Sequence, residues 1–254
     1  MKNLFSAAAL LAAASAAWGQ NVEGPPVTPY RPSVSSPAQL PVPGQLEMEI
    51  GGLSSKSDDG RRNSLPLTFK LGFSEQWGVV VSGEGYVSQP DGDGGRARGV
   101  GDTVFVLKRA FLVDDATAFG LELGAKAPTA KDSIGSGRAD YSLNGIYSRD
   151  IGELHLDANL NVTRLGAVDP GSSRSQTGWS ASFSAPVADR WGANWEVSGT
   201  RRDGAASTAQ LLLAATYSPS RRLTLDAGFT RGLNKATPDW SFFTGAVFPL
   251  AKLW

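Results

Sequence analysis

Apolar and polar residues alternate strictly from Leu154 to Val162, with leucine, alanine and valine at every even position and His155, Asp157, Asn159 and Asn161 between them. This period of two predicts a β-strand with one apolar and one polar face. The pattern recurs and predicts twelve strands, at residues 45–54, 64–73, 77–87, 101–111, 118–127, 139–148, 154–164, 178–185, 191–200, 208–217, 223–230 and 240–250. An even number of strands, each of about 9 to 11 residues, is typical of a barrel that crosses the outer membrane.

The segments between these strands alternate in length. Short ones are expected at 74–76, 112–117, 149–153, 186–190 and 218–222, and mostly longer ones at 55–63, 88–100, 128–138, 165–177, 201–207 and 231–239. Outer-membrane barrels have tight periplasmic turns and longer extracellular loops. The predicted fold is therefore all-β, a membrane-spanning antiparallel up-and-down barrel of about twelve strands over 45–254, with both termini in the periplasm.

The two faces of the strands differ in bulk. One face carries large apolar residues, for example Leu65, Leu67, Phe69, Leu71 and Phe73, while the other carries glycine, small polar residues and charge. A soluble sandwich would bury its bulky face against a second sheet. A small polar face makes a poor dry core, so we expect the bulky face to meet lipid.

The chain begins with features of an export signal. Lys2 is followed by an apolar run that ends in small residues before Gly19, so residues 1–19 are a predicted signal peptide, cleaved before Gln20. The run is shorter than the roughly 18 residues that a membrane span needs. Export and a barrel together predict the outer membrane of a Gram-negative bacterium.

Residues 20–44 contain seven of the fifteen prolines and almost no alternation. Proline cannot donate to a sheet ladder, so this stretch is expected to be extended and outside the sheet. Two interpretations are open: a periplasmic extension or a plug within the lumen.

The composition excludes several other classes of protein. Without Lys2 the chain has 23 basic and 24 acidic side chains, too balanced for nucleic-acid binding. The absence of cysteine excludes a thiol nucleophile, a disulfide framework and a lipidated N-terminal cysteine.

Several short motifs resemble those of one family. They are Arg31-Pro32 and Pro37-Ala38 leading to the run 44–49, Gly99-Val100-Gly101-Asp102, Lys126-Ala127-Pro128-Thr129, and Gly135-Ser136-Gly137 before Asp140. Together they resemble the transporter family named for the MetA pathway of phenol degradation. The resemblance implies an outer-membrane barrel that passes small molecules, with hydrophobic or aromatic compounds as candidates. The chain departs from the pattern at Ala130, where glycine is common, and in its last strand, which Pro249 and Lys252 interrupt.

Charged residues on the polar face are the candidate functional residues. Alternation points eleven of them inward, mostly acidic: Glu47, Glu49, Lys70, Glu84, Asp102, Lys108, Glu122, Lys126, Asp157, Glu196 and Asp226. Charges at membrane depth must face water or one another. They could form a cross-strand ion-pair network, such as Lys108 with Glu122, or a mildly acidic wall that favours cations. Twelve strands lie between barrels that pack solid and barrels that stay open, so both interpretations stand.

No catalytic residue, cofactor or metal site is predicted. His155, the single histidine, points into the lumen near the periplasmic end, where pairing with Asp157 or a neighbouring strand is expected. The Asp91–Gly95 stretch resembles a calcium loop but lacks its later ligands. The glycine pairs around 99–101 and 135–137 precede no helix that could bind phosphate.

Arginines cluster in or beside the long segments: Arg61, Arg62, Arg96, Arg98, Arg138, Arg174, Arg201, Arg202 and Arg231. Guanidinium groups suit lipopolysaccharide phosphates, although nearby aspartates could balance them instead. The expected partners are thus outer-membrane lipid and lipopolysaccharide, a small-molecule permeant and the barrel-assembly machinery. Three functions stay open: a channel, a closed barrel with surface-binding loops, and a barrel enzyme that uses His155.

Overall fold

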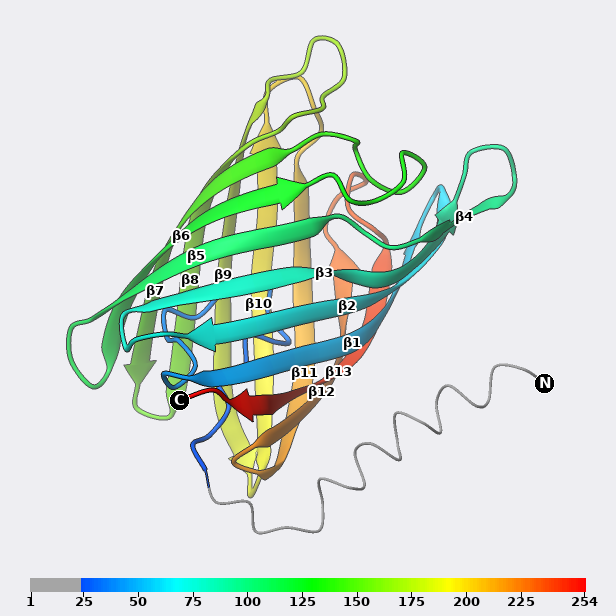
Figure 1. Ribbon diagram of the computed structural model, residues 1–254. Helices are drawn as coiled ribbons and strands as arrows, with labels where there is room; N and C mark the ends of the chain where they lie inside the picture. The colour runs from blue at the N-terminus through cyan, green and yellow to red at the C-terminus, as the bar shows by residue number, and fades with distance from the viewer. Residues whose placement is uncertain (1–23) are drawn as a thin grey trace.

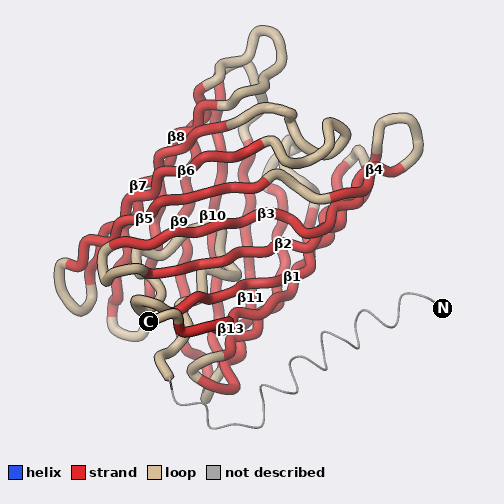
Figure 2. Tube along the Cα trace, viewed as in Figure 1, coloured by secondary structure: helices blue, strands red, loops and turns tan. Residues whose placement is uncertain are grey.

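The computed structural model describes residues 24–254, and strands make up its wall. They are β1 (Gln45–Ser57), β2 (Gly60–Gly72), β3 (Trp77–Pro90), β4 (Arg96–Gly99), β5 (Thr103–Leu112), β6 (Thr117–Ala127), β7 (Asp140–Ile151), β8 (Leu154–Arg164), β9 (Ser175–Ala188), β10 (Trp191–Arg202), β11 (Thr208–Ser220), β12 (Leu223–Gly232) and β13 (Trp240–Lys252). Figure 2 shows the turns and loops that connect these strands at the two ends of the wall. Each of the twelve predicted strands is present.

The sheet closes on itself. The first and last strands of the wall, β1 and β13, pair antiparallel from Gln45↔Lys252 to Lys56↔Trp240. Every other wall strand pairs with its neighbours along the chain, β3 with β5 included. Strand β4 pairs only with the end of β3 and projects beyond the wall (Figure 1). The fold is a closed antiparallel barrel of twelve strands, as predicted.

Two of the expected long segments, 55–63 and 88–100, are more than half strand. The sequence predicts a loop at residues 55–63, but β1 and β2 continue through them to a tight turn at Asp58 and Asp59. Their polar residues form ladder pairs, among them Ser55↔Arg62. These residues are polar because the two strands extend past the apolar, lipid-facing band of the wall. Residues 88–100 likewise contain the end of β3 and all of β4.

Pro249 sits inside β13 at an irregularity of the closing seam. The register of β1 against β13 shifts between Leu46 and Glu47, and Pro249 pairs with Glu47 there. A bulge leaves a residue outside the regular ladder, so a residue without an N–H is accommodated at this point. The interruption expected in the last strand therefore does not prevent closure.

The faces of the wall are inverted relative to a soluble protein. Outward side chains are large and exposed, such as Phe105 (51%), Leu123 (54%) and Phe242 (58%), whereas inward charged groups such as Lys70 are fully buried. An apolar exterior suits a lipid solvent. Between residue 24 and the C-terminus, no helix has the length and apolarity required to cross a bilayer.

The short turns and the C-terminus share one end of the barrel. There the Leu253 amide donates to the Gly44 carbonyl at 2.8 Å, which places the start of β1 beside the end of the chain. Residues 24–44 enter at this end, visible as the blue stretch in Figure 1, and contact the inner faces of strands around the barrel. Ser35 and Ala38 are 1% and 0% exposed. The predicted signal peptide, residues 1–19, lies outside the described residues.

The seam can be tested with paired cysteines, because the native chain has none. Ile50 and Ala246 are register partners on β1 and β13. We expect Ile50→Cys/Ala246→Cys to cross-link on mild oxidation and the denatured chain to migrate faster on non-reducing gels. The control pair Ile50→Cys/Ala215→Cys, with the second cysteine on β11, should stay uncross-linked. Equal cross-linking of both pairs would contradict the closure.

Candidate functional site

The eleven predicted inward charges lie on the inner face of the wall, and most of them are paired. Lys70 on β2 contacts Glu47 at 3.1 Å and Glu49 at 2.6 Å, both on β1. Lys108 on β5 contacts Glu122 on β6 at 3.1 Å, which confirms that predicted pair. Cross-strand neighbours on one face are close enough for such contacts. The wall therefore carries an ion-pair network over β1, β2, β5 and β6.

Two further groups lie nearer the long-loop end. Lys126 on β6 contacts Asp102 at 3.2 Å and Asp140 on β7 at 2.8 Å. Arg62 on β2 contacts Glu84 on β3 at 2.6 Å. The sequence pattern predicts that Arg62 lies in an extracellular loop. Because β2 begins earlier than predicted, Arg62 belongs to the strand and its side chain points into the barrel.

The segment before β1 supplies backbone donors to the wall carboxylates. The Thr28 amide donates to both oxygens of Glu47 at 3.1 Å, and the Tyr30 amide donates to Glu49 at 2.7 Å. The amides of Val34 and Ser35 both donate to Glu196 on β10 at 2.8 Å. A buried carboxylate is costly unless hydrogen bonds or opposite charge compensate it. These three carboxylates are therefore compensated in part by residues 24–44.

Tyr30 is held from three sides. Its hydroxyl donates to the Gln39 carbonyl at 2.8 Å, and its ring lies 4.2 Å from the Lys70 ammonium and 4.1 Å from the Lys108 ammonium. Cations over an aromatic face are attracted by its quadrupole, more strongly where water is excluded. The ring thus joins the two lysine clusters of the wall across the interior.

Arg31 lies over the closing seam. Its Nε and one terminal nitrogen donate to the two oxygens of Asp226 on β12 at 3.0 and 2.9 Å, a bidentate pair. Gly51 and Gly245 are register partners on β1 and β13, and a side chain at either would overlap the guanidinium. Glycine at both positions is what lets the arginine lie flat against the seam.

The rest of the segment is anchored on the opposite wall. The Ser36 amide donates to Asn159 on β8, and the Ala38 amide donates to Ser148 on β7, both at 2.8 Å. Ala38 also packs in a small apolar cluster with Ala118 and Ile146. The segment therefore contacts strands around most of the circumference of the barrel.

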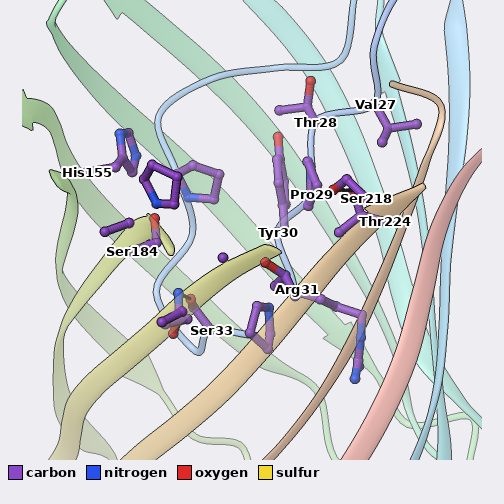
Figure 3. Close-up of a pocket in the computed structure, with 18 of the residues that line it drawn as sticks. Val27, Thr28, Pro29, Tyr30, Arg31, Ser33, His155, Ser184, Ser218 and Thr224 are labelled. Carbon is purple, nitrogen blue, oxygen red and sulfur yellow. Dashed lines mark hydrogen bonds between the residues drawn. The ribbon is translucent and has the colours of Figure 1, made fainter. Parts of the chain in front are cut away.

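The interior contains cavities, two of them lined in part by the segment. One of about 800 Å³ opens between Val27–Leu40 and the inner faces of β8 to β12, with Ser184, Ser218 and Thr224 on its wall (Figure 3). A second, of about 290 Å³, lies against Thr68 and Ser82 of the other wall. A third, of about 390 Å³, shares those two residues and continues to Ile134 and Gly135 in the β6–β7 loop. Tyr30, Arg31, Ser33 and Ser35 line both the first and the second cavity, so they separate the two.

His155 lines the first cavity, as expected for an inward residue near the short turns. Its Nδ1 lies 2.5 Å from Asp150 and its Nε2 lies 3.2 Å from Asp157. Ser184 is its register partner on β9 and faces the same cavity. Because both ring nitrogens face carboxylates, neither has a lone pair directed at the serine, and a general base needs one.

Some residues of the site carry no signal in the sequence pattern. Tyr30 and Arg31 lie in a stretch without alternation, so nothing in the pattern indicates which way they point. Asp140 follows a glycine-rich loop, and its position opposite Lys126 depends on the start of β7. The signal that could have drawn attention to them is the family resemblance, whose motifs include Arg31-Pro32 and Asp140.

A closed twelve-stranded antiparallel barrel with an apolar exterior and a charged interior has the fold of an outer-membrane β-barrel. The family described as "Putative MetA-pathway of phenol degradation" matches residues 31–250, and the chain belongs to that family. The resemblance drawn from the short motifs is thereby confirmed.

The chain is similar in fold to solved structures that include channels and porins. An outer-membrane channel from Pseudomonas putida F1 is 15% identical over 88% of this chain and 100% of its own, with a TM-score of 0.65. The KdgM porin is 8% identical over 81% and 99%, with a TM-score of 0.58. The CymD monoaromatic hydrocarbon channel is 9% identical over 82% and 89%, with a TM-score of 0.50. No curated protein matches the chain.

The Arg31–Asp226 pair can be tested with a thiol reporter. Ser35→Cys places the thiol where the native hydroxyl has no hydrogen-bond partner, so the reporter itself should perturb little. Breaking the bidentate pair with Asp226→Asn costs on the order of 2 kcal/mol, so we expect maleimide labelling of the introduced thiol to quicken by more than about tenfold.

Asp189→Asn is the matched control, because that carboxylate is 95% exposed in a short turn. It should leave the labelling rate of the Ser35→Cys thiol unchanged. Equal labelling rates in the Asp226→Asn and Asp189→Asn backgrounds would show that the pair does not hold the segment.

Proposed function

We propose that this protein is a channel of the Gram-negative outer membrane for small molecules, with residues 20–44 as a plug in its lumen. The observation that carries the proposal is the set of contacts between wall carboxylates and the segment. Glu47, Glu49 and Glu196 accept backbone amides from it, and Asp226 accepts its arginine. A segment that merely trailed into the periplasm would leave these buried groups without those donors.

The three cavities support a route for a permeant around the segment. The third reaches the β6–β7 loop and shares Thr68 and Ser82 with the second, and the side chains of Tyr30–Ser35 lie between the second and the first, which opens toward the short-turn end. Small shifts of that stretch would join them, whereas a solid core would leave no such space. This favours a gated channel over a permanently closed barrel.

Hydrophobic or aromatic compounds are the proposed permeants. The family takes its description from a phenol-degradation pathway, and a channel for monoaromatic hydrocarbons shares the fold. The segment contributes Pro29, Pro32 and Leu40 to the cavity of about 800 Å³, and the wall opposite contributes hydroxyl groups. Such a mixed lining suits a small ring compound with a polar substituent.

The inward carboxylates are proposed to act on selectivity chiefly when the plug is displaced. With the plug present, Lys70, Lys108 and Arg31 balance several of them, and amides solvate others. Without it, Glu196 and Asp226 would lose their partners and face water, whereas Glu47 and Glu49 would keep only Lys70 of the wall, and carboxylates exposed to a lumen disfavour anions.

Deleting Asn21–Val42 tests the channel and the plug together. We expect single-channel conductance in planar bilayers to rise several-fold, and the reversal potential in a salt gradient to shift toward cation selectivity. An unchanged conductance would reject the plug; absence of any conductance from folded, inserted protein would favour the closed barrel with surface-binding loops.

A carboxylate substitution supplies the control. Glu196→Gln should weaken cation selectivity in the shortened protein, because the carboxylate is then exposed to the lumen. In the full chain, where two amides occupy Glu196, it should change the reversal potential much less. Equal shifts of the reversal potential in the shortened and the full-length protein would show that the plug does not shield Glu196 from the lumen.

A further inference from the structure

A row of cations crosses the closing seam on the outside of the barrel. Arg61 on β2 pairs with Lys56 on β1, Lys56 pairs with Trp240 on β13, and Trp240 pairs with Arg231 on β12. Register partners project from the same face of a sheet as near neighbours. Three cations and one tryptophan therefore lie side by side on four adjacent strands.

This row faces outward. Arg62, next to Arg61, points into the barrel and pairs with Glu84, so strand alternation turns Arg61 to the outside. Trp240 packs against Phe242 at 5.0 Å between ring centroids, and Phe242 is 58% exposed on the apolar exterior. The row consequently stands at the edge of the lipid-facing surface, at the long-loop end.

The three cations have no carboxylate partner among residues 24–254. The Lys56 ammonium donates to the Ser57 carbonyl, and Arg231 donates to the Asp239 carbonyl. The Arg61 guanidinium lies 5.4 Å from the Trp240 ring. The acidic groups nearest in sequence are Asp58, Asp59 and Asp239, and in the described part of the protein none of their carboxylates forms an ion pair with the row.

We propose that this row binds the phosphate groups of lipid A, the glycolipid of the outer leaflet. Guanidinium and ammonium groups are strong donors to phosphate oxygens. The ring of Trp240 suits the interface between headgroups and hydrocarbon. Phe242 and Phe229, 6.4 Å apart on the same exterior, continue the surface toward the acyl chains.

This inference goes beyond transport, since it requires only the barrel and its orientation in the outer membrane. It also reduces the set of arginines that are expected to contact lipopolysaccharide. Arg62 is turned inward, and Arg174 donates to the Leu165 and Gly166 carbonyls. Lys56, which sequence patterning does not select, completes the row.

Native mass spectrometry of the full mature protein in detergent tests the proposal, with bisphosphorylated lipid A as the probe. We expect Lys56→Gln/Arg61→Gln/Arg231→Gln to bind lipid A at least about tenfold more weakly than the wild type, since charge-assisted contacts are lost. Dephosphorylated lipid A should bind the wild type about as weakly. Phosphatidylglycerol, which carries a single phosphodiester, should differ less in affinity between the wild type and the triple variant than bisphosphorylated lipid A does.

Arg149→Gln is the matched control, because Arg149 is an exposed cation at the short-turn end of β7. It should bind lipid A as the wild type does. Retained heat-modifiable migration will show that the triple variant folds; if it does not fold, the single Arg61→Gln variant should still bind about threefold more weakly. Equal affinity of wild type and variants, or of the two lipid A forms, would overturn the proposal.

Discussion

The interior of this barrel is governed by the cost of burying carboxylates. A closed wall in lipid directs charged side chains inward, where bulk water is restricted, and each then needs a donor or an opposite charge. The wall supplies Lys70 and Lys108, but Glu196 and Asp226 find their partners on the segment before β1. The segment and the wall are therefore one electrostatic unit, and neither is satisfied without the other.

Strand alternation assigns neighbouring residues to opposite environments. Arg61 and Arg62 are adjacent in the chain, yet one lies beside Trp240 on the exterior and the other pairs with Glu84 inside. Because side chains alternate with a period of two, a single stretch of strand contributes residues both to the lumen and to the membrane-facing surface. Glycines at the seam add a local exception, because Gly51 and Gly245 leave room for Arg31 where side chains would overlap it.

Sequence patterning predicts the strands well where they cross the apolar band and less well beyond it. All twelve wall strands are predicted, since each carries a bulky outward face. The stretch 55–63 is expected to be a loop because its residues are polar, yet Ser55, Lys56 and their partners extend the ladder to a tight turn. Strand β4 is not predicted because four residues show too little alternation to be recognised.

The sequence by itself determined the strands, their two faces and the identity of the inward charges, because side-chain direction in a strand depends only on local backbone geometry. Tertiary structure alone decided the partners. Arg31 meets Asp226 across 195 positions of the chain, a contact that exists only once the seam has closed and the proline-rich segment has taken its path. That segment has no alternation, so its contacts follow from the cavity that receives it.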